Sequence, residues 1–312
     1  MFDISELHIE VSSRCVLKCP RCPRTELPEL HTLNTDYSLA EFQSCFPPKT
    51  LEQIDRIVFC GDTGDPIYAR EFYEIVRYIK QTKPTLILKI VTNGSYKSRE
   101  WWRELKTVMN NWDSITFSVD GWDHDSNNLY RVNSDYASIL EGVSEMVVSP
   151  VHVNWSTIIF SFNEDRISQI DQQARDLGVD SLQIVDSTKF GGSYEVDGVD
   201  PLKPTKTISD TVYNKNRIYF TGNREKQLAK KSVKNVWQKC LTPDVIPFIS
   251  VTGEFYPCPW FNSGYMINTF LDQNRDVINV RKRNLIDVAN DPLWDELWLN
   301  IQPICRYKCY DR

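Results

Sequence analysis

The sequence predicts an α/β protein built on a parallel sheet. Six apolar, β-branched runs alternate with segments of helical spacing over residues 5–186. Polar or glycine-rich motifs follow most of these runs, and parallel strands bring such motifs to one edge of a sheet. The alternation alone leaves two architectures open, a partial barrel and an open doubly wound sheet.

The predicted elements follow one another in the order expected for right-handed crossovers. Strands are expected at 7–11, 54–60, 86–92, 114–119, 153–160 and 182–185, and helices at 38–46, 70–81, 98–110, 135–148 and 165–177. Beyond residue 186 the alternation stops, and glycine and proline residues indicate a connecting region over 187–239, with a basic helix predicted near 224–238. A hairpin that turns at Thr252-Gly253 is then predicted over 246–258, and a helix with a break near Pro292 over 285–300.

Composition narrows the class of protein. The 312 residues are 41% hydrophobic and 25% charged, and the net charge is −6. A nucleic-acid partner is therefore not expected, because no overall positive charge attracts one. No apolar stretch approaches the roughly 20 residues that a membrane helix needs, and the N-terminus has no signal-peptide pattern. We expect a cytoplasmic protein, in which nine cysteines indicate metal binding more than disulfides.

Three of the cysteines lie close together directly after the first predicted strand. Cys15, Cys19 and Cys22 follow the spacing Cys-x3-Cys-x2-Cys. A [4Fe–4S] cluster normally has four cysteine ligands, so three thiolates leave one iron open for another ligand. The alternative is a structural zinc site, which usually has four ligands and would recruit His31 as the fourth.

Further motifs stand at the ends of the later strands. The second strand runs into Cys60-Gly61-Asp62-Thr63-Gly64-Asp65, the third into Thr92-Asn93-Gly94, and the fourth into Ser118-Val119-Asp120-Gly121. Tyr130-Arg131 follows the fourth strand, and Asn163 follows the fifth. A glycine-rich bend allows backbone oxygens to approach an ammonium group, and an arginine is a suitable partner for a carboxylate.

The cysteine spacing and these motifs, in this order, resemble the radical S-adenosylmethionine (SAM) superfamily. The resemblance implies a partial (β/α)6 TIM-like barrel with a [4Fe–4S] cluster on Cys15, Cys19 and Cys22. It also implies SAM contacts at Gly61, Gly64 and Asp65 for the amino group, at Ser118 and Arg131 for the carboxylate, and at Asn93, Asp120 and Asn163. Arg21 stands where the family commonly has an aromatic residue beside the adenine, and a guanidinium is able to stack on a purine.

A second cysteine set lies in the C-terminal part of the chain, at Cys240, Cys258, Cys305 and Cys309. It resembles the Twitch domain, the shortened SPASM domain, and so implies a second, auxiliary [4Fe–4S] cluster. A four-cysteine zinc ribbon is the alternative. The expected domains are a barrel over 1–186, the connecting region over 187–239 and the Twitch domain over 240–312.

The function that the resemblance implies is reductive cleavage of SAM to a 5′-deoxyadenosyl radical, which takes hydrogen from a substrate C–H bond. We expect a net oxidation or modification of a peptide or a small polar metabolite, with the auxiliary cluster as electron acceptor and a flavodoxin- or ferredoxin-type reductant. The first strand starts close to residue 1, so we expect no leader-recognition module before the barrel. Two further hypotheses remain, a non-catalytic interaction protein stabilised by zinc and a simple electron carrier.

Overall fold

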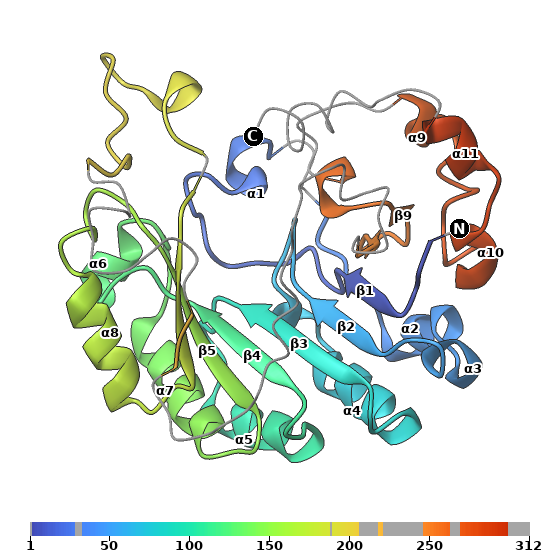
Figure 1. The fold of residues 1–312 in the computed structure, drawn as a ribbon, viewed down its shortest axis with the longest axis horizontal. Coiled ribbons are helices and arrows are strands. Elements are labelled where there is room, and N and C mark those ends of the chain that lie inside the picture. Colours follow the sequence, from blue (N-terminus) through green and yellow to red (C-terminus); the bar gives the residue numbers. More distant parts are fainter. Residues whose placement is uncertain are drawn as a thin grey trace. The chain divides into compact units, whose positions relative to one another are not determined.

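The computed structural model describes residues 2–28, 33–187, 189–205, 218–220, 246–262 and 269–298. The strands of the described residues form one sheet in the order β7-β6-β5-β4-β3-β2-β1-β8-β9 (Figure 1). This order has two ends, so the sheet is not closed. The strands are β1 Glu6–Ile9, β2 Arg56–Phe59, β3 Ile87–Thr92, β4 Ser114–Ser118, β5 His152–Ile158, β6 Ser181–Val185, β7 Ile218–Phe220, β8 Phe248–Ile249 and β9 Phe255–Tyr256.

The helices of the described residues alternate with strands β1 to β6 as the sequence predicts. They are α1 Pro23–Glu26, α2 Leu39–Cys45, α3 Pro48–Leu51, α4 Phe72–Thr82, α5 Arg99–Val108, α6 His124–Asn128, α7 Tyr136–Val147, α8 Ile167–Asp176, α9 Thr269–Gln273, α10 Leu285–Ala289 and α11 Leu293–Trp298, with 3-10 turns at Pro66–Tyr68, Gly192–Tyr194 and Pro259–Phe261. All six predicted strands and all five predicted helices of the first 186 residues are present. None of the described helices is long and apolar enough to cross a membrane.

The chain divides into two compact units, and each is described by itself. The first comprises residues 1–15, 27–89 and 225–312, and the second comprises 16–26 and 90–224. The predicted division into domains at 186 and 239 stays a prediction, because the second of these boundaries falls outside the described residues.

In the first unit, β1 lies between β2 and β8 and is parallel to both. Leu7, Ile9 and Val11 alternate along this segment and are fully buried. The hairpin of β8 and β9 turns at Gly253, whose φ of 96° is accessible to glycine at little cost. The predicted hairpin is therefore confirmed, but its pairing with β1 was not predicted, because a strand of two residues has no readable period.

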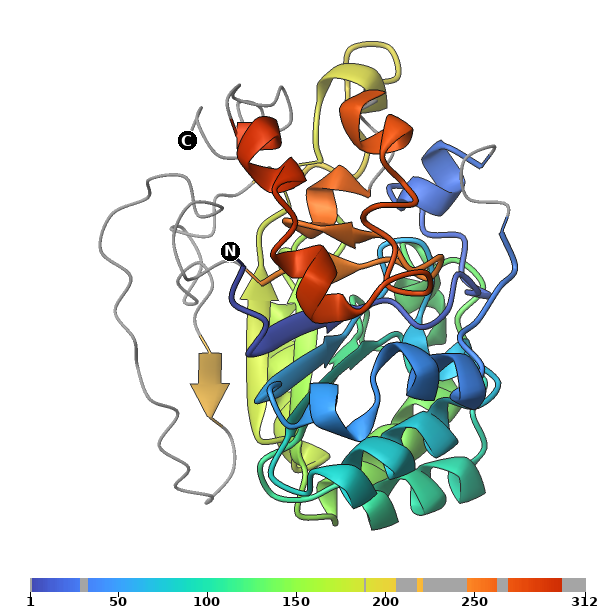
Figure 2. The ribbon, with the colours of Figure 1, turned by 90° about the vertical axis from the view of Figure 1, so that its right-hand side faces the viewer.

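The C-terminal segment of the first unit is held by aromatic and charged contacts. Figure 2 shows α10 and α11, in red, close to the hairpin, in orange. The ring of Trp294 lies 5.6 Å from Phe255 and 5.4 Å from Phe2. The predicted helix over 285–300 is two helices, α10 and α11, which are separated near Pro292 as expected.

In the second unit, β4, β5 and β6 are parallel neighbours. The strand β7 lies in the predicted connecting region and pairs antiparallel with β6, which the sequence did not reveal. The predicted basic helix near 224–238 lies outside the described residues. On the outside of this sheet, α5 contacts α7, and Trp102 of α5 is fully buried.

We predict that Gly142→Ala destabilises the second unit. A Cβ at Gly142 would lie 2.7 Å from two atoms of the Trp102 indole, too close for a large buried ring to accommodate without a shift. Overpacking of this kind costs about 1–3 kcal/mol of unfolding free energy. Glu141→Ala, at an exposed neighbouring position of the same helix, is the control and should change stability by less than about 0.5 kcal/mol in denaturant unfolding.

Candidate functional site

The glycine loop, residues 61–65, follows β2 in the first unit and lies against the chain just beyond β1. A Cβ on Gly64 would come within 2.0 Å of the Ser12 carbonyl oxygen, and one on Gly61 within 1.6 Å of the Gly64 oxygen. The Asp65 amide donates to the Arg14 carbonyl at 2.9 Å. Both glycines are therefore required by close approach of the chain's own backbone, and their contact with the SAM amino group stays a prediction.

The carboxylate of Glu10 is hydrogen-bonded to the backbone of this glycine loop. Its Oε1 accepts hydrogen bonds from the backbone amides of Thr63 and Gly64, the latter at 3.0 Å. Glu10 is only 1% exposed, and burial raises the pKa of its carboxyl, although these hydrogen bonds oppose the shift. Its second oxygen, Oε2, is buried and has no hydrogen-bond partner among the described residues. A buried acceptor without a donor is unusual and requires an explanation.

Asp65, the acidic residue of the predicted motif, has a local role in the structure. Its Oδ1 accepts a hydrogen bond from the Ile67 amide at 3.2 Å and so caps the turn Pro66–Tyr68. Asp65 is 6% exposed. Its contact with the SAM amino group stays a prediction.

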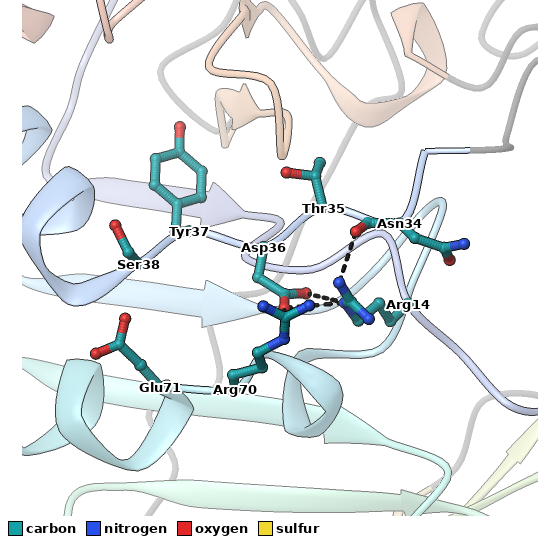
Figure 3. A pocket seen from close by; sticks show the side chains of 8 residues that line it. All are labelled: Arg14, Asn34, Thr35, Asp36, Tyr37, Ser38, Arg70 and Glu71. Carbon is teal, nitrogen blue, oxygen red and sulfur yellow. Dashed lines mark hydrogen bonds and ion pairs between the residues drawn. The ribbon is translucent and has the colours of Figure 1, made fainter.

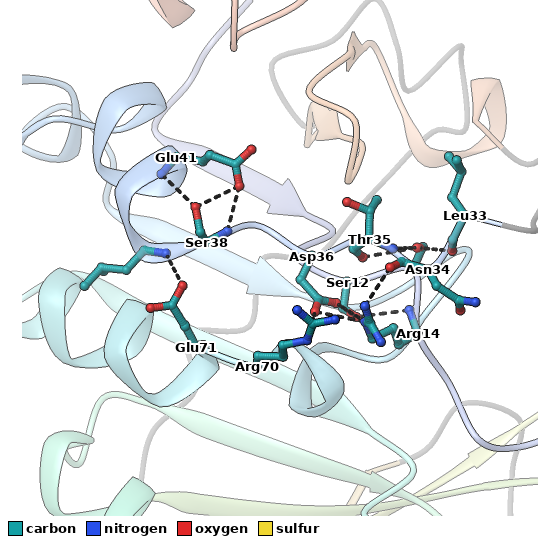
Figure 4. Close-up of polar contacts among 12 residues, drawn as sticks. Ser12, Arg14, Leu33, Asn34, Thr35, Asp36, Ser38, Glu41, Arg70 and Glu71 are labelled. Atoms are coloured by element: carbon teal, nitrogen blue, oxygen red, sulfur yellow. Dashed lines mark hydrogen bonds and ion pairs between the residues drawn. The ribbon is translucent and has the colours of Figure 1, made fainter.

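A polar cavity of about 230 Å³ lies in the first unit beside the start of the cysteine motif (Figure 3). Arg14 and Arg70 both point toward Asp36, with nitrogen–oxygen distances of 3.0 and 3.8 Å. Asp36 also accepts from Ser12 Oγ at 2.7 Å, so it anchors the residues that precede Cys15. Figure 4 shows the neighbouring capping box, in which Ser38 and Glu41 start helix α2.

Cys19 and Cys22 lie in the second unit together with Arg131. Burial raises the pKa of the Cys19 thiol to about 11, against an attraction and a hydrogen bond from Arg131. The Cys22 thiol and the Asp120 carboxylate lie close enough to raise this pKa further. A metal must displace the thiol proton to bind, and Arg131 then offers a positive charge to the thiolate.

Asp120 connects the ends of β4 and β5 in the same unit. Its Oδ2 accepts from Arg131 Nε at 2.6 Å and its Oδ1 accepts from the Ile158 amide at 2.7 Å. The Asp120 carboxylate raises the pKa of the Arg131 guanidinium against the opposite effect of burial, so Arg131 stays charged. The Asp120 carboxylate therefore fixes the position of Arg131. The contact of Arg131 with the SAM carboxylate stays a prediction.

Asn163 and Asn93 use their side chains on the backbone around them. Asn163 is fully buried, and its Nδ2 donates to the carbonyls of Asp120 and Ile158 at 2.8 and 2.9 Å. Asn93 Oδ1 accepts from the Ser95 amide at 2.9 Å, beside Gly94, whose φ is 73°. Both residues shape strand ends, and their contacts with SAM stay predictions. Ser118 is the last residue of β4 and is half-buried.

Arg21, between Cys19 and Cys22, forms a buried ion pair with Asp200. Both side chains are at most 4% exposed, Arg21 Nη1 lies 2.9 Å from Asp200 Oδ2, and Nη2 also contacts the carboxylate. The guanidinium lies 5.1 Å from the Phe190 ring and 4.3 Å from the Tyr194 ring. Burial would raise the pKa of Asp200, but hydrogen bonds from Arg21, Gly191 and Leu202 lower it to about 2. Arg21 therefore ties the segment 189–202, here called the strap, to the cysteine motif.

The structure does not test the two predicted metal sites. Among the described residues, which include Cys15, Cys19 and Cys22, no three histidine, cysteine, aspartate or glutamate side chains converge closely enough to hold a metal ion, and the cluster on these cysteines stays a prediction. Cys240, Cys305 and Cys309 lie outside the described residues. Cys258 follows β9, where it precedes the turn Pro259–Phe261 and is half-buried. Cys15, Cys19, Cys22, Cys45, Cys60 and Cys258 are not in disulfides.

Sequence reasoning missed two groups of residues that matter here. Glu10 alternates with buried apolar residues in the first strand, which is typical of a solvent-facing position, yet it is enclosed. The strap residues Phe190 and Asp200 lie in a segment without periodicity, and no local pattern links them to Arg21. Tyr130 was noted only as a neighbour of Arg131, but it lies close to both Cys19 and Cys22, and its ring is 4.2 Å from Phe160.

The architecture and these loops at the ends of parallel strands define a mixed α/β protein of the partial-barrel kind, and comparisons with known proteins agree. No family model matches the chain. A probable GTP 3′,8-cyclase from Methanocella arvoryzae is 24% identical over 196 residues, which are 62% of this chain. The chain spans only 60% of that relative.

Solved structures show the same fold over most of the chain. SuiB of Streptococcus suis bound to its precursor peptide SuiA has a TM-score of 0.64 at 14% identity, covering 95% of this chain and 66% of SuiB. The protein anSMEcpe with bound SAM has a TM-score of 0.60 at 17% identity, covering 97% of this chain and 86% of that one. The predicted α/β fold with a parallel sheet is therefore confirmed, and of the two open architectures the partial barrel is the one observed.

We predict that Asp200→Ala releases the strap. Removing one partner of a buried ion pair leaves the other charge uncompensated and costs about 3–5 kcal/mol. Amide hydrogen exchange over residues 189–202 should therefore accelerate by at least about 100-fold, with smaller changes in the strands. Glu195→Ala, at an exposed position of the same strap, is the control, and equal exchange rates in the two variants would contradict the role of the ion pair.

Proposed function

We propose that this chain is a radical SAM enzyme that carries a [4Fe–4S] cluster on Cys15, Cys19 and Cys22. The observation that carries the proposal is the motif Cys-x3-Cys-x2-Cys directly after β1 of a partial-barrel fold, followed by the glycine loop after β2. The relative and the SAM-bound neighbours support the same class. A zinc site would account for the cysteines, but it would not need a glycine loop clamped by a buried carboxylate.

The residues present fit SAM. The buried Oε2 of Glu10, whose other oxygen binds the glycine loop, lacks a donor among the described residues and is an acceptor suited to the amino group of SAM. Arg131 is kept charged by Asp120, as a residue that binds a carboxylate must be. When bound, the cluster and SAM supply reductive cleavage and hydrogen abstraction from a substrate C–H bond.

The chain's own residues position the cofactors and exclude water. Tyr130, Phe160, Phe162 and Phe190 form an aromatic cluster, in which the ring centroids of Phe160 and Phe162 are 5.5 Å apart. Tyr130 lies close to Cys19 and Cys22, so one edge of this aromatic cluster reaches the two thiols. Apolar surface beside the thiols helps to protect a reactive intermediate from solvent.

We propose a peptide as the substrate, with a small polar metabolite as the alternative. The neighbours SuiB and anSMEcpe were solved with bound peptides, which supports the first, and the name of the GTP 3′,8-cyclase relative supports the second. A flavodoxin- or ferredoxin-type protein is the proposed reductant. We also propose a cytoplasmic location, where thiols stay reduced.

We predict that Cys19→Ala abolishes SAM cleavage. The variant loses one of the three thiolates, so it should retain little of the iron at this motif and form no 5′-deoxyadenosine with SAM and dithionite under anaerobic conditions. Cys45→Ala is the matched control, since Cys45 is a buried cysteine of α2 outside both motifs. A Cys19→Ala protein that still produces 5′-deoxyadenosine at the wild-type rate would rule out the proposed function.

We further propose that Cys240, Cys258, Cys305 and Cys309 hold an auxiliary [4Fe–4S] cluster that accepts an electron during turnover. We predict that Cys258→Ala lowers the iron content from about eight to about four atoms per chain. Uncoupled SAM cleavage should persist in this variant while substrate oxidation is lost. If the wild-type protein, purified anaerobically, contains zinc instead of iron at these four cysteines, the proposed iron–sulfur cluster is ruled out.

A further inference from the structure

The acidic residue of the glycine loop is already engaged in its own turn. Asp65 directs Oδ1 to the Ile67 amide, and its own amide donates to the Arg14 carbonyl. A carboxylate that caps a turn contributes less charge to a ligand on the loop than one whose oxygen is uncommitted. The amino group of SAM, which the glycine loop is proposed to bind, therefore needs a second acidic partner.

Glu10 has the geometry for this role. Its Oε1 is fixed by two successive amides of the glycine loop, so the carboxylate cannot rotate away without losing both hydrogen bonds. Its Oε2 is enclosed and has no donor. No ion pair to Glu10 occurs among the described residues, and the groups that donate to its carboxylate are the backbone amides of Thr63 and Gly64.

The chemistry of this oxygen selects the class of group that it accepts. An ionised carboxyl oxygen in a buried setting requires a donor, and a positively charged donor gives the strongest hydrogen bond. An ammonium group needs only acceptors, and Glu10 Oε2 is a buried acceptor without a donor among the described residues.

We propose that Glu10 is the residue that binds the α-ammonium group of SAM through Oε2, while Oε1 positions the glycine loop around it. The inference rests on the proposed function, since it assigns a residue to the amino group of that cofactor. It moves the acidic partner from Asp65, at the end of β2, to Glu10, just beyond β1.

The test compares Glu10→Gln with Glu6→Gln in anaerobically reconstituted protein. Glutamine keeps an oxygen that accepts from Thr63 and Gly64, but it places an amide NH2 where Oε2 stood. The affinity for SAM, measured by anaerobic equilibrium dialysis, should fall by at least about ten-fold, the effect of losing a hydrogen bond to a charged group. Glu6→Gln is a matched change in β1 outside the glycine loop, at a side chain that pairs with Arg56, and should change the affinity by less than about three-fold.

A second ligand separates direct binding from a merely structural role. 5′-Methylthioadenosine contains the adenosine and sulfur of SAM but has no amino acid part, so Glu10→Gln should bind it within about two-fold of the wild type. Equal weakening of both ligands, or unchanged SAM affinity in Glu10→Gln, would overturn the assignment. If Glu10→Gln does not fold, Glu10→Asp replaces it, because it keeps the charge but withdraws it by one methylene and should again weaken SAM alone.

Binding of SAM by the wild type separates a failure of the proposed function from a failure of the role proposed for Glu10. An iron-loaded wild-type chain that binds no SAM would overturn the proposed function itself. A wild type that binds SAM, with a Glu10→Gln variant that binds it equally well, would overturn only the role of Glu10.

Discussion

The close backbone approach between the ends of β1 and β2 is the constraint on which the candidate site depends. Ser12 and Gly64 touch main chain to main chain, and neither glycine of the loop has space for a Cβ. Glu10 secures this contact with two hydrogen bonds to loop amides. The residues that lead into Cys15 are fixed from the other side by Asp36, which contacts Ser12 and Arg14. The start of the cysteine motif is thereby set by backbone geometry rather than by the side chains of the motif itself.

In the second unit, the site is fixed by hydrogen bonds to a buried carboxylate and not by close backbone contact. Asp120 is fully buried, yet each of its oxygens has a donor, from Arg131 and from the Ile158 amide. Asn127 Oδ1 accepts hydrogen bonds from the amides of Asp120 and Gly121, and Asn163 donates to the Asp120 carbonyl. A buried acid is tolerable only when its acceptors are satisfied in this way. The network fixes the ends of β4 and β5 and delivers a charged Arg131 next to Cys19.

Much of this fold was predictable because its local and global signals agree. The first residues of three predicted helices, Ser38, Ser98 and Asp135, are the N-cap residues of α2, α5 and α7. The strand β7 and the pairing of β8 with β1 were missed, since strands of two or three residues carry no period. The short helix α6 was missed because its five polar residues depend on a capping box between Asp123 and Ser126 instead of an apolar face.

The site was predictable only where its residues are neighbours in sequence. The cysteines and the glycines were found because their spacing is fixed by one loop each. Glu10 acts on residues more than fifty positions away, and its enclosure follows from the sheet and from the glycine loop that covers it, not from its own strand. Alternation along β1 describes which side a residue faces, but it does not say whether that side is open to solvent.

The partner of Arg21 was likewise not predictable from the local sequence, because it lies far away in the chain. An arginine next to a cluster ligand would repel an incoming cation if its charge were free. Here Asp200 neutralises it, and hydrogen bonds from Arg21, Gly191 and Leu202 keep the pKa of Asp200 at about 2. The pair brings Phe190 and Tyr194 against the guanidinium, so the aromatic surface beside the cysteine motif comes from the strap and not from the motif. Arg21 is thus coupled to a residue 179 positions away in the sequence.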